Sequence, residues 1–501
     1  MNIKIRSFTH SFIVMLMTVV IAQAQAGDQL SLKADDGKAP ESTITEVERL
    51  KSEMEKLQMV VEQQRQLLLE MQKRLVMMEA SLPQKTSAPN DKSVVANATA
   101  SQTPSLGDGT TVTKPPSAQE KPPAVAGWDK NHAFLRSADG AFETTIGGYA
   151  QLDFRGYASG NHPPNTFLIR RARLILEGRL HRYYDYKIEG DFSDTNNTIL
   201  RDGFVRIHRI EALQLTFGQF RVPISQEEIR SDNTQDFIER SLVNNLVPSR
   251  SPGLMASGVI SRGKFAYQVG AFNGKGLLAG NNSGTPEIAL RLRFSPWKQE
   301  KIFLAKGLSF GGAITQGRNV NGQSVRGQTE SRSFTFFAPE TVNGKYTRAN
   351  AELTWLLGSA AFRAEYVQTH QQRQSLGAGG TNLPGVIAKG YMAQFTYLLT
   401  GEAKPEAATV TPKRELFSNE NGRRGLGAFE LKFRYANLQI ADGTPRSNRA
   451  ETIFFGPNWY LNRFARYLLD LGFERYKDPS RSPSPHDKNF FVVLSRLQFT
   501  L

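Results

Sequence analysis

The feature that most constrains this chain is a two-residue alternation of apolar and polar side chains, which runs from residue 148 to the C-terminus. In residues 288–294, for example, isoleucine, two leucines and phenylalanine alternate with alanine and two arginines. A period of two predicts β-strands with one apolar and one polar face. Turn-like stretches of Gly, Asn, Asp and Pro separate about 16 such segments, which begin near residues 148, 167, 183, 199, 212, 255, 264, 287, 306, 348, 361, 389, 427, 450, 465 and 489.

A soluble β-sandwich also alternates, but two further features favour a membrane barrel. First, aromatic residues gather near the strand ends, as in interfacial girdles; these are Tyr149, Tyr157, Tyr184, Trp297, Trp355, Tyr391, Tyr397 and Tyr467. Second, short connections such as 180–183 and 209–212 alternate with long ones at 222–254, 316–347 and 401–426, which is typical of periplasmic turns and external loops. We therefore predict an all-β transmembrane barrel of about 16 antiparallel strands, closed in lipid and wide enough to enclose water.

The segment FLIRRARLILEGRL, residues 167–180, shows how such a barrel would use its arginines. Arg171 and Arg173 would face the lumen, whereas Arg170 falls on the lipid-facing phase near the strand end, where its stem can reach the interface. The residues expected to face lipid are Leu168, Ala172, Leu174 and Leu176.

Other cations expected on the lumen face are Arg155, Lys187, Arg291, Arg293, Arg363, Lys432 and Arg434. Taken singly, each is better explained as a solvated cation balanced by a neighbouring carboxylate. Together they predict a lumen with net positive charge, which concentrates anions.

The first residues predict export. Residues 1–26 begin with Lys4 and Arg6, continue with an apolar run and end in Ala-x-Ala patterns, which is typical of a secretory signal peptide. An N-terminal anchor helix is the alternative. No later stretch reaches about 18 uncharged apolar residues, so we expect no transmembrane helix to follow.

A coiled coil and a linker are predicted between the signal peptide and the barrel. Within the N-terminal segment 27–82, apolar residues at 44–82 recur at alternating steps of three and four, which predicts a coiled coil and therefore self-association. An amphipathic helix docked on its own domain is the alternative. Residues 83–126 are rich in Pro, Ala and Ser and predict a flexible linker to a barrel domain at 127–501.

The chain is basic, with 62 Lys and Arg against 47 Asp and Glu in 501 residues. Residues 1–126 contain 14 of each kind, so residues 127–501 carry the whole excess of 15 positive charges. A basic, exported domain favours an anionic partner. Nucleic acid fits poorly, because the basic residues are interleaved with acids along the strands and form no stripe with stacking aromatics.

Enzyme motifs are missing from the sequence. The chain has no cysteine, which excludes a disulfide framework and a thiolate metal site, and its seven histidines are scattered. It contains no His-Glu-x-x-His motif, no Gly-x-Ser-x-Gly motif and no Gly-rich phosphate loop. We therefore expect no catalysis, no cofactor and no metal site.

Three stretches resemble the phosphate-selective porin O and P family. They are FLIRRARLILEGRL at 167–180, YKIEGDF at 186–192 and LTFGQFRVPISQEEIRSDNTQDFIERSLVNNLVPSRSPG at 215–253. The third is the most specific, because a strand ending in Gly-Gln-Phe-Arg-Val-Pro leads into a long loop with Phe-Ile-Glu-Arg-Ser-Leu. The resemblance covers residues 134–501, and N-terminal coiled coils also occur in this family.

The resemblance implies a homotrimer of 16-stranded barrels in the outer membrane, with the coiled coil in the periplasm. Its partners would be itself, outer-membrane lipid and small anions. The long loop at about 222–254 would fold into the lumen, where basic residues bind phosphate or polyphosphate. With the strand cations, the expected anion-binding and pore-lining residues are Arg155, Arg171, Arg173, Lys187, Arg221, Arg230, Arg240, Arg250, Arg291 and Arg293.

The same loop also contains acids that outnumber its four arginines. They are Glu227, Glu228, Asp232, Asp236 and Glu239. A general, non-specific porin is therefore one alternative to a phosphate channel. A barrel that mainly tethers the outer membrane to the cell wall through its coiled coil is another.

Overall fold

The computed structural model describes residues 124–129, 132–158, 163–193, 199–420, 423–443, 448–477 and 488–501. The predicted signal peptide, the N-terminal segment with its coiled coil and nearly all of the predicted linker lie outside these residues. In the described part of the chain, no helix is long and apolar enough to cross a bilayer.

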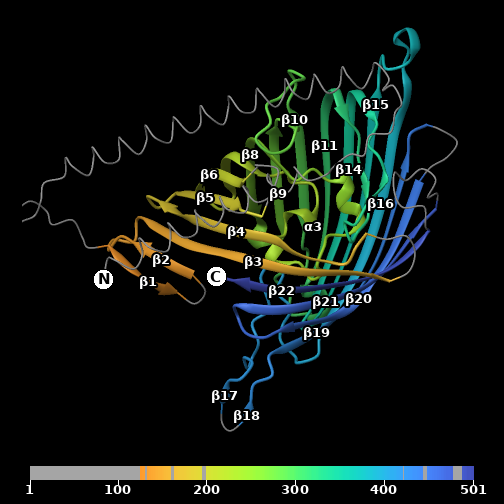
Figure 1. The fold of residues 1–501 in the computed structure, drawn as a ribbon. Coiled ribbons are helices and arrows are strands. Elements are labelled where there is room, and N and C mark those ends of the chain that lie inside the picture. The colour runs from red at the N-terminus through yellow and green to blue at the C-terminus, as the bar shows by residue number, and fades with distance from the viewer. Residues whose placement is uncertain are drawn as a thin grey trace, which may run out of the picture. The chain divides into compact units, whose positions relative to one another are not determined.

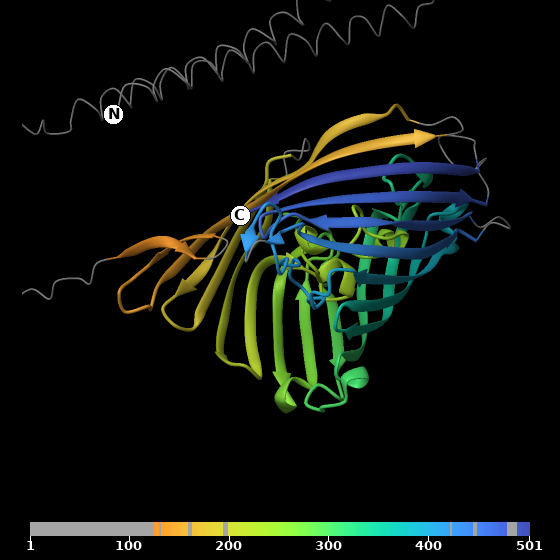
Figure 2. The same cartoon turned by 90° about the horizontal axis from the view of Figure 1, so that it is seen from below.

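Sixteen antiparallel strands form a closed barrel (Figure 1, Figure 2). Each strand pairs with its neighbour in chain order, and the last strand pairs with the first, from Thr500 opposite Tyr149 to Phe491 opposite Ala158. The predicted barrel and its strand number are therefore confirmed. The barrel strands are β3 (Glu143–Ala158), β4 (Thr166–Leu180), β5 (Tyr184–Asp191), β6 (Leu200–Ile210), β7 (Leu213–Arg221), β8 (Arg250–Ile260), β9 (Phe265–Phe272), β10 (Glu287–Phe294), β11 (Leu308–Gln323), β14 (Thr341–Leu357), β15 (Ala360–Arg373), β16 (Leu383–Leu398), β19 (Ala428–Ala441), β20 (Asn448–Tyr460), β21 (Ala465–Tyr476) and β22 (Asn489–Thr500).

Side chains on these strands alternate between the lumen and the outer surface. On β10, Glu287 and Ala289 are buried toward the lumen, whereas Ile288 and Leu290 are exposed on the outside. An apolar outer wall is what a lipid-spanning barrel requires, because acyl chains cover it.

The predicted aromatic girdle is partly wrong. Tyr149 and Tyr157 are buried and share the lumen phase of β3 with Gln151 and Asp153. Their residue type had suggested the outer wall, but the phase of their own strand decides their orientation. The predicted girdle residues that are exposed on the outer wall are Tyr184, Trp297, Tyr391 and Tyr397.

A β-bulge interrupts β4 next to its arginines. Gln151 of β3 pairs with Arg171, and the next residue, Leu152, pairs with Ile169, so Arg170 is the extra residue. One extra residue reverses which side chains face the lumen in the part of β4 that precedes the bulge.

The bulge overturns two predicted orientations. Arg170 points into the lumen, where its Nε lies 2.6 Å from Glu239, and does not run along the lipid face. Before the bulge, the outward face is carried by Phe167 and Ile169, which are 83% and 59% exposed, and not by Leu168.

The two ends of the barrel differ in their connections. Short turns such as 181–183 and 211–212 join strands at one end, which marks it as the periplasmic end. At the external end, β7 and β8 are joined by residues 222–249, here termed the third loop. Residues 324–340 between β11 and β14, here termed the fifth loop, are shorter than the predicted 316–347 because both strands extend into that range.

Residues 399–427, which join β16 to β19, were wrongly predicted as an external loop. β16 is the twelfth barrel strand and, like every even-numbered strand, it ends at the periplasmic end. This connection, here termed the periplasmic insert, carries a small hairpin of β17 (Asn419–Glu420) and β18 (Arg423–Arg424), which extends away from the barrel (Figure 1).

A second hairpin precedes the barrel. β1 (Val125–Asp129) and β2 (His132–Arg136) pair with each other, and β2 also pairs with residues 143–146 of β3. The sequence had given no prediction of this hairpin.

The third loop folds back inside the barrel, where its helical turns lie within the ring of strands (Figure 2). It contains α3 (Gln226–Ile229), η1 (Asp232–Thr234) and η2 (Leu242–Leu246). The Ser225 hydroxyl caps α3 by accepting a hydrogen bond from the Glu228 N–H at 3.1 Å. The fifth loop contributes β12 (Gly327–Gln328) and β13 (Thr335–Phe337).

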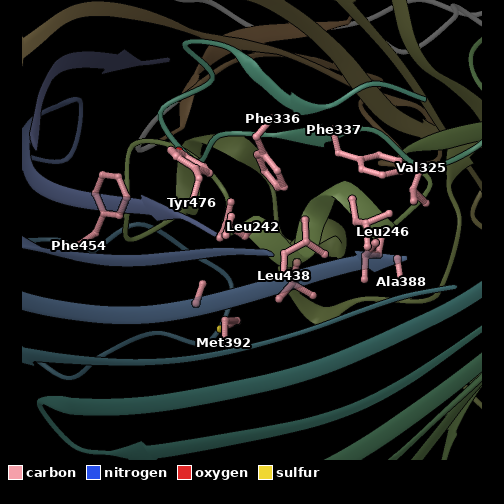
Figure 3. Packing of buried hydrophobic residues seen from close by; sticks show 14 of the residues in the cluster. Leu242, Leu246, Val325, Phe336, Phe337, Ala388, Met392, Leu438, Phe454 and Tyr476 are labelled. Atoms are coloured by element: carbon pink, nitrogen blue, oxygen red, sulfur yellow. The ribbon is translucent and has the colours of Figure 1, made fainter. Parts of the chain in front are cut away.

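An apolar cluster fixes both loops to the inner wall of the barrel (Figure 3). Leu242 and Leu246 of η2, with Phe336 of the fifth loop, are at most 1% exposed. Such burial stabilises the docked loops, since each large apolar side chain contributes roughly 1.5–3 kcal/mol. The wall residues in this cluster include Val367, Val386, Ala388, Met392, Leu438, Val492 and Leu494.

Candidate functional site in the lumen

Asp232 of the third loop is the centre of an ion-pair network. Its carboxylate faces two arginines of β4, one at the end of β7 and one of the loop itself. The partners are Arg171 at 3.3 Å, Arg173 at 2.7 Å, Arg221 at 3.2 Å and Arg240. One loop carboxylate therefore neutralises charge on cations that the sequence had assigned to anion binding.

Glu239 is a second junction in the same loop. It lies 2.6 Å from Arg155 of β3, 2.6 Å from Arg170 of β4 and 3.1 Å from Arg332 of the fifth loop. Arg155 also donates to the Ser331 carbonyl at 2.5 Å. Glu239 thus holds two loops against two strands.

These loop acids are ionised at neutral pH because their cationic partners outweigh burial. Burial raises the pKa of Asp232, but the guanidinium groups of Arg171 and Arg240 with their neighbours hold that pKa well below its usual value. Burial also raises the pKa of Glu239, and Arg170 and Arg155 outweigh it in the same way.

Asp236 joins the third loop to the periplasmic insert. It lies 3.1 Å from Arg230, 3.0 Å from Arg363 of β15 and 2.7 Å from Lys404 of the insert. Lys404 also pairs with Glu430 of β19. Segments that enter the lumen from opposite ends therefore meet at one carboxylate.

Two further predicted cations bridge β5, β6 and β8. Lys187 lies 2.9 Å from Glu189 and 3.3 Å from Asp202. Arg250 lies 2.6 Å from Asp202 and 3.3 Å from Glu189. Arg173 connects this group to the third loop, because it also lies 2.6 Å from Glu189.

The last two predicted cations lie apart on β10. Arg291 pairs with Glu352 of β14. Arg293 pairs with Glu406 of the insert and donates to the Ser309 hydroxyl at 2.9 Å. The structure thus places eight of the ten predicted cations in three ion-pair groups on the third loop, six connected to Asp232, one to Glu239 and one to Asp236, and leaves this pair outside them.

Some lumen residues were missed. Arg206 of β6 and Arg496 of β22 lie on the polar phase of alternating strands, a signal that could have found them. Arg496 pairs with Asp153 through two contacts of 2.6 and 2.7 Å. Lys404 could not be found from an alternating pattern, because it lies in a Pro- and Ala-containing connection that the sequence had assigned to an external loop.

Three cavities form a row along the inner wall from β3 to β14, in the periplasmic half of the lumen. Their volumes are about 300, 280 and 640 Å³. The first two share Arg206, and the last two share Arg293, so we term them the cavity row. Ile229 of the third loop lines the middle cavity.

The cavity row is lined by more cations than acids. Seven cationic side chains stand against four carboxylates. The cations are Arg179, Lys187, Arg206, Arg291, Arg293, Lys298 and Lys306, and the acids are Glu143, Glu177, Asp185 and Glu406. Among the residues that the structure describes, no cluster of three or more His, Cys, Asp or Glu is arranged to hold a metal ion.

Residues 145–501 match the family model of phosphate-selective porin O and P. The chain belongs to this family. It is an outer-membrane porin, and the resemblance carried by residues 167–253 is confirmed. A channel, and not an enzyme, is what the family and the barrel indicate.

Relatives of this porin are distant in sequence. Porin O of Pseudomonas aeruginosa is 22% identical over 403 residues, which is 73% of this chain and 90% of that protein. OmpT of Vibrio cholerae in its trimer form is 9% identical with a TM-score of 0.47, covering 72% of this porin and 100% of that chain. An anion-selective porin from Comamonas acidovorans is 13% identical with a TM-score of 0.45, covering 72% and 99%.

Proposed function

We propose that this porin passes small hydrophilic anions by passive diffusion, with phosphate or polyphosphate as the preferred solute. The cavity row carries the proposal, because three of its seven cations, Arg206, Lys298 and Lys306, have no carboxylate at ion-pair distance in the described part of the chain and leave it positively charged. Such a passage concentrates anions and repels cations. The planar guanidinium groups suit phosphate, because each can contact two of its oxygens.

The lining of the cavity row separates the cations that can contact a solute from those that hold the third loop. Lys187, Arg206, Arg291 and Arg293 line it, whereas the arginines paired with Asp232 and Glu239 do not. We therefore assign weak solute contacts to Lys187, Arg206, Arg291 and Arg293. The arginines around Asp232 and Glu239 fix the third loop.

A general porin is the second candidate. It is favoured by the loop carboxylates, which neutralise most of the arginines that the family resemblance would give to phosphate. In that case the cavity row would pass anions faster than cations but would not bind phosphate.

The deciding experiment is the zero-current potential of the purified porin in a planar bilayer under a KCl gradient, followed by addition of phosphate. An anion-selective potential with chloride current blocked by phosphate supports the phosphate channel. Weak selectivity without block supports the general porin. A protein without conductance would overturn both and favour a structural role.

We further propose a homotrimer in the outer membrane whose predicted coiled coil, residues 44–82, lies in the periplasm and reinforces assembly. Five heptads of apolar seam need burial against other chains. Deleting residues 44–82 should lower the melting temperature of the trimer in detergent and leave single-pore conductance unchanged. An unchanged melting temperature would contradict this role.

A further inference from the structure

The largest cavity of the row is more than a passage for an inorganic ion. Its volume of about 640 Å³ lies within the range of roughly 300–1,000 Å³ that is usual for small-molecule sites. It opens at the periplasmic mouth between the end of β14, the periplasmic insert and the turn that carries α4 (Phe303–Lys306). Apolar side chains, chiefly Phe303 and Leu356, form one wall.

Cations form the other side of this cavity. Lys298 and Lys306 line it, and in the described part of the chain neither is paired with a carboxylate. Arg293 lines it as well and pairs with Glu406. Because the Glu406 and Arg293 side chains are 49% and 29% exposed, their ion pair is weak, and an incoming anion can replace Glu406 at little cost.

We infer that this cavity binds an organic anion with a compact apolar body, such as an aryl or short-alkyl phosphate or carboxylate. The anionic group lies between Arg293 and the two lysines and displaces Glu406. The apolar body packs on Phe303 and Leu356, contacts that inorganic phosphate cannot make. The inference rests on the proposed anion channel and specifies the class of solute that its periplasmic mouth retains.

Current block by phenyl phosphate tests the inference against inorganic phosphate. With the full-length porin in a planar bilayer, phenyl phosphate added from the periplasmic side should halve the chloride current at a concentration about tenfold lower than phosphate does, because burial of the ring adds favourable free energy. Equal potency of the two anions would overturn the inference.

Variants locate the site. Phe303→Ala and Leu356→Ala should each weaken the block by phenyl phosphate about three- to tenfold and leave the block by phosphate unchanged. Glu406→Gln should strengthen the block by phenyl phosphate. Leu304→Ala is the matched control, since Leu304 is an exposed apolar residue of the same turn that does not line the cavity. An effect of Leu304→Ala as large as that of Phe303→Ala would overturn the assignment.

Binding measured without current separates this inference from the proposed function. Saturation-transfer NMR of phenyl phosphate with the detergent-solubilised porin should show ring contacts that Phe303→Ala removes. If the bilayer shows no anion selectivity but the NMR contacts are present, the channel proposal fails and the site stands. If selectivity is present and the ring contacts are absent, the site fails alone.

Discussion

The two sides of the lumen use the same residue types in opposite ways. On one side, which we term the sealed side, the third and fifth loops are packed against β15 to β22 and against β3 and β4, and the arginines are buried with carboxylates. On the other, the open side, the cavity row in the periplasmic half of the wall from β3 to β14 leaves its cations partly exposed. Position relative to the third loop, and not residue type, decides whether an arginine fixes the fold or meets a solute.

The energetic contrast follows from burial. Removing one partner of a buried ion pair costs about 3–5 kcal/mol, because the remaining charge stays uncompensated in a poorly solvated site. An exposed pair contributes about 0–1 kcal/mol. Substitutions on the sealed side should therefore lower the stability of the porin, whereas substitutions on the open side should change its ion selectivity.

Asp232→Asn should have the largest effect. It leaves four guanidinium groups without their shared carboxylate and should destabilise the docked third loop by about 3–5 kcal/mol. The loop should become sensitive to limited proteolysis, and the zero-current potential should shift toward anions. Glu451→Gln, on the outer wall, is the control and should change neither. A protease-resistant Asp232→Asn porin would show that the apolar cluster alone seals this side.

Lys404→Met should have the next largest effect. It removes the cation that Asp236 and Glu430 share, at a cost of about 3 kcal/mol, and should release the insert from the lumen. The expected readout is cleavage within residues 399–427 by protease added at the periplasmic end. Lys413→Met, an exposed position of the same insert, is the control. Equal cleavage of both variants would mean that Lys404 does not hold the insert.

The barrel could be predicted from the sequence because alternation is a local property. Each of the 16 predicted strand starts lies within seven residues of the start of a barrel strand. The orientation of Arg170 could not be predicted, since one extra residue reverses the phase and the bulge leaves no mark in the local pattern. The end at which the insert lies could have been derived by counting strands.

The sealed side was beyond prediction for a different reason. Its contacts join residues far apart in the chain, such as Asp236 with Lys404 and Glu239 with Arg155. The only local sign was a loss of alternation, as in FFVVL at 490–494, where Val492 and Leu494 face the lumen and are buried. Inward apolar residues in a wide barrel indicate a loop packed against them.

Arg206→Ala tests the open side. Arg206 lines two cavities, and the part of the chain that the structure describes offers it no carboxylate partner. Its loss should therefore change stability by less than about 1 kcal/mol but lower the anion preference in the zero-current potential. Arg496→Ala is the sealed-side counterpart and should lower stability without changing the anion preference, since it leaves buried Asp153 with only a longer contact of 3.5 Å to Arg155. If both variants change stability alike, the distinction between the two sides is wrong.

Acidification from pH 7 to pH 5 should have the smallest effect. The pKa values of Asp232, Asp236 and Glu239 are held well below their usual values, because cationic neighbours outweigh the burial that raises them. A carboxylate whose pKa is lowered on folding gives its full stabilisation above the unfolded value of about 4, and loses it only as the pH falls toward the lowered value. Protease resistance of the third loop at pH 5 should therefore equal that at pH 7, with loosening only below about pH 4. Loss of protection between pH 7 and pH 5 would show that these acids are not the groups that seal the lumen.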